Sequence, residues 1–157
     1  MRDVVVTGSV SDLAGVSARR VFDLVTDVSR LPEWNEIITR VVERPTTLEP
    51  GAEWVVELKA MGSSWRSRAR VVDVDASAGR FAYRSQTDDG NPSYGDWVWQ
   101  IDDDDAGARI TVAWELHPET FWRQALLVRI RHRLLRKEVR ASLRSLESTL
   151  LDTGGQP

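Results

Sequence analysis

The strongest constraint on the fold is the stretch 119–151, near the end of the chain, which contains neither glycine nor proline. Leucine, alanine, arginine, glutamate and lysine dominate it, and these residues favour the α-helix. Pro118 precedes the stretch, and Gly154 and Gly155 follow it, as expected at helix boundaries. At about 1.5 Å per residue, the predicted helix is roughly 50 Å long.

Apolar residues recur along this predicted helix at helical spacing. They are Leu127, Ile130, Leu134, Leu135, Val139, Leu143, Leu146 and Leu150. Arginine and lysine occupy the other faces. Because an apolar stripe must be buried against another element, and the rest of the chain is mostly strand-like, we expect a sheet that curls around the helix.

Alternation of apolar and polar residues predicts the strands of that sheet. The predicted strands are 3–13, 38–44, a strand in which Trp54, Val56 and Leu58 share a face, 64–75, 80–87, 94–101 and 108–116. Short connections between the later strands predict an antiparallel meander. The acidic stretch 102–107 is predicted to be a hairpin turn.

Two short helices are predicted between the first and second strands. Ser17 is a suitable N-cap for the first, which carries Val21 and Phe22 on its apolar face. The second covers 29–34, with Ser29 as its cap and Pro32 in its first turn, where proline is tolerated.

Length and composition narrow the class of protein. The 157 residues are most simply one domain, 1–152, with a flexible tail at 153–157. The formal net charge of -3 argues against a nucleic-acid binder. The chain has no cysteine, and its first residues lack the apolar core of a secretory signal. We therefore expect a cytoplasmic protein.

Seven tryptophans are the unusual feature of the composition. Six aromatic residues fall on strand faces predicted to point inward: Trp54, Trp65, Tyr83, Trp97, Trp99 and Trp114. They can form a dense core beneath the helix, or they can line a cavity for an apolar or aromatic ligand. For the set as a whole, a cavity is favoured, partly on the resemblance described next.

The order of elements and several local motifs resemble a known family. The motifs are Val16-Ser17-Ala18-Arg19-Arg20-Val21-Phe22, Asp27-Val28-Ser29-Arg30-Leu31-Pro32-Glu33-Trp34, Pro50-Gly51, and a hairpin from Trp99-Gln100-Ile101 to Gly107-Ala108-Arg109-Ile110-Thr111-Val112-Ala113-Trp114. Together they are similar to the START-like or SRPBCC superfamily, which has the helix-grip fold, and to its polyketide cyclase/dehydratase-like branch. The resemblance covers about residues 3 to 150.

This resemblance implies an α+β fold in which a seven-stranded antiparallel sheet curls around the long C-terminal helix. The two short helices would close one end. Members of the superfamily commonly hold an apolar ligand between sheet and helix, and they include lipid carriers, polyketide aromatase/cyclases and oxygenase subunits. Fold alone therefore leaves the function open.

The predicted ligand-binding residues combine the inward strand faces with the start of the long helix. They are Trp54, Val56, Trp65, Ala69, Tyr83, Trp97, Trp99, Trp114, Phe121 and Gln124. Few of these groups can transfer a proton. Tyr83 and His117 are weak catalytic candidates, and the alternative is that Tyr83 packs in the core and His117 lies on the surface.

No metal or other cofactor is expected. The two histidines, His117 and His132, are far apart in the sequence, and His132 lies in an arginine-rich segment that repels cations. That basic segment, 129–137 continued by Arg140 and Arg144, is best explained as the solvated face of the helix, partly balanced by Glu138 and Glu147. Weak contact with an anionic membrane surface is the alternative.

The sequence thus predicts that a hydrophobic or aromatic small molecule, such as a lipid or a polyketide-like compound, is bound and possibly transported in a cavity between sheet and helix. The alternative is a polyketide aromatase/cyclase or dehydratase that uses the same cavity. A membrane-peripheral protein is a third hypothesis. We expect a small-molecule ligand, no nucleic acid, and a monomer or a homodimer.

Overall fold

A computed structural model describes residues 6–60, 62–87, 93–105, 107–117 and 122–154, with side chains except in 6–14, 122–133 and 152–154. The elements are β1 (Val6–Ala14), α1 (Ala18–Val25), η1 (Val28–Arg30), α2 (Leu31–Trp34), β2 (Ile38–Glu43), β3 (Glu53–Ala60), β4 (Ser63–Asp75), β5 (Arg80–Thr87), β6 (Tyr94–Asp104), β7 (Gly107–His117) and α3 (Trp122–Gly154). The predicted α+β class, with an antiparallel sheet and a long C-terminal helix, is confirmed.

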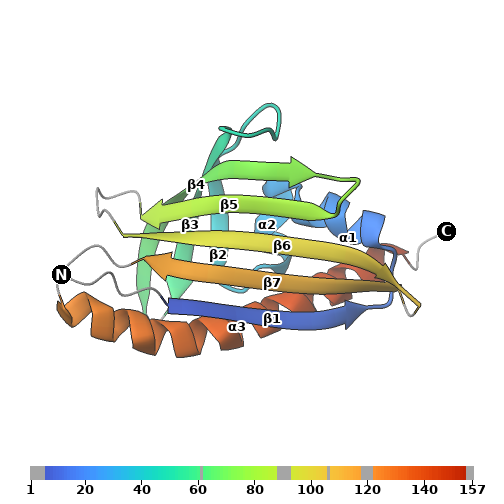
Figure 1. The fold of residues 1–157 in the computed structure, drawn as a ribbon. Helices are drawn as coiled ribbons and strands as arrows, with labels where there is room; N and C mark the ends of the chain where they lie inside the picture. The colour runs from blue at the N-terminus through green and yellow to red at the C-terminus, as the bar shows by residue number, and fades with distance from the viewer. Residues whose placement is uncertain (1–5, 61, 88–92, 106, 118–121, 155–157) are drawn as a thin grey trace.

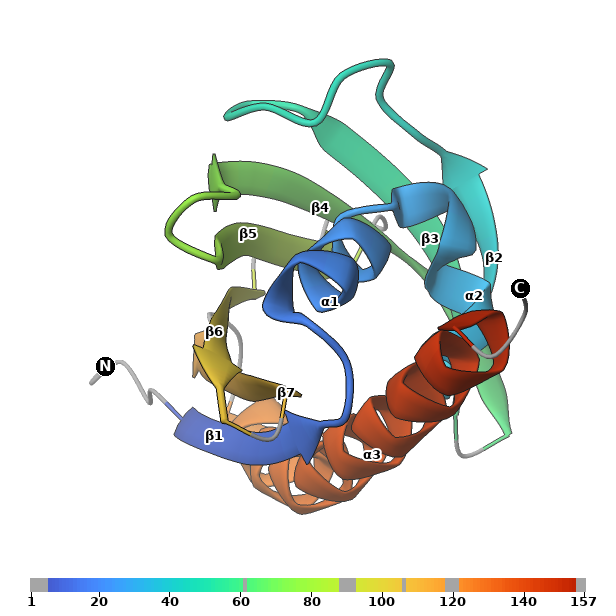
Figure 2. The ribbon, with the colours of Figure 1, turned by 90° about the vertical axis from the view of Figure 1, so that its right-hand side faces the viewer.

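The described strands form one sheet in the order β1-β7-β6-β5-β4-β3-β2, and neighbouring strands run antiparallel. The first strand therefore lies beside the last, while the other strands follow one another as a meander. The helix α3 runs alongside β1 (Figure 1), and the sheet curls so that its concave face looks toward α3 (Figure 2). Viewed from the end of the sheet, α1 and α2 lie across the opening of the curl (Figure 2).

The two short helices begin differently. Ser17 caps α1 as predicted, because its side chain accepts a hydrogen bond from the backbone N–H of Arg20. The prediction that Ser29 caps the second helix is wrong. Ser29 lies inside the 3₁₀ turn η1, and its hydroxyl donates to the carboxylate of Asp27 instead. The helix α2 follows directly, with Pro32 in its first turn.

Two predicted boundaries need correction. The acidic residues 102–104 belong to β6 rather than to a turn, because Asp104 pairs with Gly107 across a very tight hairpin. Thr153 and Gly154 continue α3 rather than beginning a flexible tail. The predicted helix start at 119–121 and the strand start at 3–5 lie outside the described residues.

A β-bulge in β4 explains a break in the alternation of that strand. Val71 pairs with Tyr83, but the next pair is Asp73 with Ala82, so Val72 has no partner in the register. The bulge leaves Val72 60% exposed while Val71 is buried. Val74 packs against the core as well, although strict alternation would place it on the opposite face of the sheet from Val71.

The described part of α3 buries one stripe, as its spacing predicts. The stripe is Leu135, Val139, Leu143, Leu146 and Leu150. It packs toward β1, α1 and α2. The guanidinium of Arg20, on α1, donates to the backbone carbonyl of Leu150 at 3.1 Å, which joins α1 to the last turns of α3. The basic residues Arg136, Lys137, Arg140 and Arg144 are exposed on the other side.

Within the described residues, no helix combines the length and the apolar character that crossing a membrane would require.

Candidate ligand-binding cavity

A cavity of about 320 Å³ lies between the concave face of the sheet and the helices. Strands β3 to β7 supply one wall, and α1, η1 and α2 close one end. The described part of α3 contributes Leu135, Glu138, Val139 and Ser142. Val139 lies in the buried stripe of α3, yet it borders the cavity together with Ser142.

The lining changes from apolar to polar along the strands. Near α1 and α2, the wall is formed by Val25, Val28 and Leu31 together with the cross-strand pair Phe81 and Trp99. Farther along β5 and β6, the cavity is bordered by Ser85, Gln86, Thr87, Ser93 and Gly95. The cavity therefore has an apolar end beneath the short helices and a more polar end near the tips of β5 and β6.

The aromatic rings between these ends pack on one another. Tyr83 lies 5.0 Å from Trp54 and 6.3 Å from Trp97, measured between ring centroids, and Trp54 stacks on Phe81 at 5.9 Å. Two indole groups also have hydrogen-bond acceptors within the wall. Nε1 of Trp99 donates to the Tyr83 hydroxyl at 3.3 Å, and Nε1 of Trp97 donates to the Ser85 hydroxyl at 3.1 Å. These contacts hold the wall in a defined shape.

Most of the predicted ligand-binding residues border this cavity. They are Trp54, Val56, Trp65, Ala69, Tyr83, Trp97 and Trp99. Trp114 is an exception: it is 2% exposed and packs beside Trp97 in the core, with 5.7 Å between ring centroids. Phe121 and the side chain of Gln124 lie outside the described residues. Whether the bordering residues contact a ligand stays a prediction.

Of the two catalytic candidates, Tyr83 is in the cavity wall. Burial raises the pKa of its phenol to about 12, and the hydrogen bond from Trp99 opposes this rise only in part. The phenol therefore stays neutral at neutral pH, so it can donate a hydrogen bond but is a poor proton acceptor.

The raised pKa of Tyr83 predicts a loss of stability in alkali. The phenol ionises near pH 10 in the unfolded chain and near 12 in the folded one, so the stabilising contribution is complete below pH 10 and is lost as the pH rises toward 12. Tyr83→Phe should remove this part of the loss. Denaturant unfolding of both proteins at about pH 9 and about pH 11 measures it. Equal losses of unfolding free energy in the two proteins would contradict the prediction.

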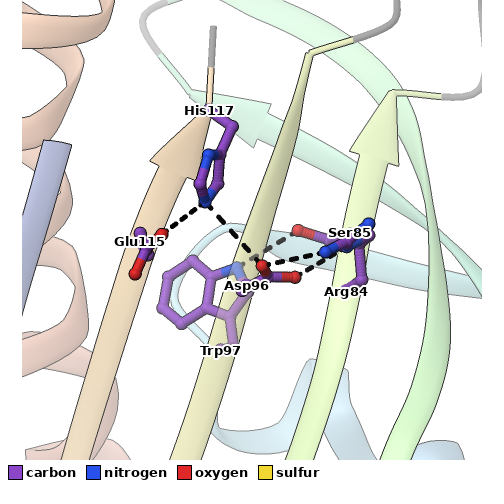
Figure 3. Close-up of polar contacts among 6 residues, drawn as sticks. All are labelled: Arg84, Ser85, Asp96, Trp97, Glu115 and His117. Carbon is purple, nitrogen blue, oxygen red and sulfur yellow. Dashed lines mark hydrogen bonds and ion pairs between the residues drawn. The ribbon is translucent and has the colours of Figure 1, made fainter. Parts of the chain in front are cut away.

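The second candidate, His117, lies at the rim of the cavity within a polar cluster (Figure 3). Its Nε2 is 2.7 Å from Oε1 of Glu115 and 3.8 Å from Oδ2 of Asp96, and neither contact qualifies as a hydrogen bond. Asp96 also holds Arg84 through two hydrogen bonds, of 2.7 and 3.1 Å. The imidazole thus faces carboxylates on the outer side of the sheet.

Tyr94 completes this rim. Its ring stacks on the His117 imidazole at 4.5 Å, and the guanidinium of Arg84 lies 4.0 Å from the centre of the same ring. The register explains the arrangement, because Tyr94 pairs with His117 and Arg84 pairs with Asp96 across neighbouring strands. The cluster fixes the ends of β6 and β7 beside the polar end of the cavity.

Trp34 and Glu138 are two of the cavity residues that were not among the predicted site residues. Trp34, the last residue of α2, is 2% exposed and borders the cavity. Glu138, on α3, borders it too, although we assigned it to the solvated face. The sequence did hold a signal for Glu138, because helical spacing places it three residues after Leu135 and four before Ser142, on one face.

A comparison with family models assigns the chain. Residues 4–150 match the family described as polyketide cyclase / dehydrase and lipid transport. The chain belongs to this family. The resemblance drawn from its sequence motifs is thereby confirmed. A comparison with curated protein sequences finds no match.

Solved structures share the fold of this family member at low sequence identity. The di-domain ARO/CYC StfQ from the steffimycin biosynthetic pathway has a TM-score of 0.76 at 13% identity, over 97% of this chain and 52% of that one. ZhuI aromatase/cyclase from Streptomyces sp. R1128 has a TM-score of 0.73 at 14% identity, over 95% and 94%. Ara h 8.0201 has a TM-score of 0.71 at 14% identity, over 95% and 99%. At such identities the likeness concerns the fold alone.

Proposed function

We propose that the protein binds a hydrophobic or aromatic small molecule, such as a lipid or a polyketide-like compound, in the cavity between sheet and α3. One observation carries this proposal: a cavity of about 320 Å³ is bordered by Trp34, Trp54, Trp65, Trp97 and Trp99. Its size falls at the lower end of the range for small-molecule sites, about 300–1,000 Å³.

The polarity of the lining sets the orientation of the ligand. An apolar ring or chain is stabilised at the end formed by α1 and α2, where burial of apolar surface contributes about 25 cal/mol per Å². The polar end of the ligand then lies near Ser85, Thr87 and Ser93, at the tips of β5 and β6. An amphipathic molecule that enters between these tips needs no polar group at the deep end.

The direct test uses an apolar naphthalene-type fluorescent probe. Because tryptophans surround the cavity, we expect the bound probe to quench tryptophan emission in a saturable way. Binding to the folded state alone also raises the melting temperature, by the equivalent of about 2.7 kcal/mol when the probe is at 100 times its Kd. If the probe neither quenches the emission nor shifts the melting temperature, the cavity does not act as a binding site and the proposal fails.

A polyketide aromatase/cyclase or dehydratase is the second candidate function. It is favoured by proton-transfer groups that border the same cavity, the phenol of Tyr83 and the carboxylate of Glu138. Two structural neighbours are also named for aromatase/cyclase activity. Turnover of a linear poly-β-ketone, compared with simple binding of it, separates this function from a carrier.

A further inference from the structure

Two hydroxyl groups of β5 accept hydrogen bonds from indole groups of β6 in the same way. Nε1 of Trp99 donates to the Tyr83 hydroxyl, and Nε1 of Trp97 donates to the Ser85 hydroxyl (Figure 3). In the register, Trp99 pairs with Phe81 and Trp97 pairs with Tyr83, so each indole reaches the residue two positions beyond its partner on β5. This repeated diagonal contact places both hydroxyls on the face of β5 that borders the cavity.

The indole contacts determine how the two hydroxyl groups point. A hydroxyl has one hydrogen and two lone pairs. Because an indole N–H occupies one lone pair of each oxygen, the hydroxyl hydrogen points away from that indole. Among the described residues, neither Tyr83 nor Ser85 donates a hydrogen bond from its hydroxyl. Each therefore has a donor available to a molecule in the cavity, and the bond that it accepts strengthens the bond that it donates.

Packing fixes the positions of both donors. The ring of Tyr83 packs edge to face on Trp54, with 5.0 Å between centroids. Gly95 lies opposite Ser85 in the register, and a Cβ there would be 3.3 Å from Nε1 of Trp97 and 3.6 Å from Oγ of Ser85. The glycine thus leaves room for the indole and the hydroxyl to meet. A donor that is fixed before binding loses little conformational freedom when a ligand binds.

Burial decides which kind of ligand these donors favour. Burial raises the pKa of the Tyr83 phenol to about 12, so the phenol keeps its proton at neutral pH. A hydrocarbon in the cavity would separate the hydroxyls from water without offering an acceptor, which is unfavourable. A ketone oxygen in the same place accepts the hydrogen bond and removes this cost.

We infer that Tyr83 and Ser85 are specificity-determining donors, which select hydrophobic ligands that carry a hydrogen-bond acceptor, such as a ketone oxygen, over hydrocarbons of the same shape. The inference rests on the proposed binding function and narrows its ligand class. It also agrees with the orientation proposed above, because Ser85 lies at the polar end and Tyr83 in the aromatic wall. The acceptor of the ligand then lies beside β5, and its apolar part extends toward α1 and α2.

Two probes of nearly the same shape test the donors. In 2-isopropenylnaphthalene, a CH₂ group replaces the ketone oxygen of 2-acetylnaphthalene. Quenching of tryptophan emission at neutral pH gives both Kd values, and the decisive quantity is the Kd of the alkene divided by the Kd of the ketone. In the double variant Tyr83→Phe with Ser85→Ala, we expect this ratio to fall about tenfold, because only the ketone loses hydrogen bonds.

Single variants and a matched control assign the effect. Tyr83→Phe and Ser85→Ala should each lower the ratio by about threefold, since each removes one donor. Ser67 also borders the cavity, but its hydroxyl already donates to the backbone carbonyl of Gln86 at 3.2 Å. Ser67→Ala should therefore leave the ratio at its wild-type value. Melting curves check that each variant is folded.

The outcomes separate the two proposals. If both probes bind the wild type but the double variant keeps the wild-type ratio, the selection by donors is overturned and the binding function stands. A single variant that keeps the full ratio overturns the role of that hydroxyl. If neither probe binds, the binding function fails and the inference about its ligand class fails with it.

Discussion

Gly79→Ala should destabilise the protein by about 3 kcal/mol or more, which is a large effect for the addition of one methyl group. Gly79 lies in the turn between β4 and β5 with φ at 67°, in the left-handed region that costs other residues about 1–2 kcal/mol. A Cβ built there would lie 1.9 Å from the backbone carbonyl oxygen of Ile101. The backbone cannot yield easily, because the N–H of Ile101 donates to the Gly79 carbonyl at 2.8 Å.

The matched control is Gly62→Ala. Gly62 has a similar φ of 75°, but a Cβ there would meet no atom within 4 Å. This variant should therefore lose only the conformational part, about 1–2 kcal/mol. Denaturant unfolding gives both values, and the difference between them isolates the clash with β6. Equal losses in the two variants would show that the Gly79 turn can move away from β6, against the packing described above.

The fold was largely predictable because its elements carry strong local signals. The stretch 119–151 has a helical period and no glycine or proline, and the strands alternate clearly, so class, order and the long helix follow from the sequence. The bulge at Val72 was not predictable, because it depends on the register between β4 and β5. Similarly, Ser29 is an acceptable cap by type, but its hydroxyl pairs with Asp27 instead.

The cavity wall was predictable on the strands and less so on the helices. Alternation places Trp54, Trp97 and Trp99 on the concave face, and the structure has them there. Trp114 shares that face but is packed in the core and does not border the cavity. Alternation cannot tell these two outcomes apart, because the space between a strand and α3 depends on packing across the whole sheet. Glu138 was misassigned because a carboxylate beside an apolar stripe can face either water or a cavity, and only the tertiary arrangement decides.

Filling the cavity gives the largest expected effect on binding. Ala69, on β4, is 3% exposed and borders the cavity, where it pairs with Trp54 on β3 and with Ser85 on β5. In Ala69→Phe the added ring must occupy the space that a ligand would take. We expect the apolar probe to lose affinity by more than about tenfold, because the ring and the probe exclude each other. Isothermal titration or quenching of tryptophan emission measures the loss.

The same substitution should not harm the fold, which separates occlusion from unfolding. A side chain that fills an existing cavity typically stabilises a protein by about 0.5–2 kcal/mol, so the melting temperature of Ala69→Phe should stay level or rise. Val72→Phe is the matched control, because it adds similar bulk to β4 at a position that is 60% exposed. It should keep the wild-type affinity. A folded Ala69→Phe protein that still binds the probe normally would place the ligand elsewhere, since two groups cannot share one space within a cavity of about 320 Å³.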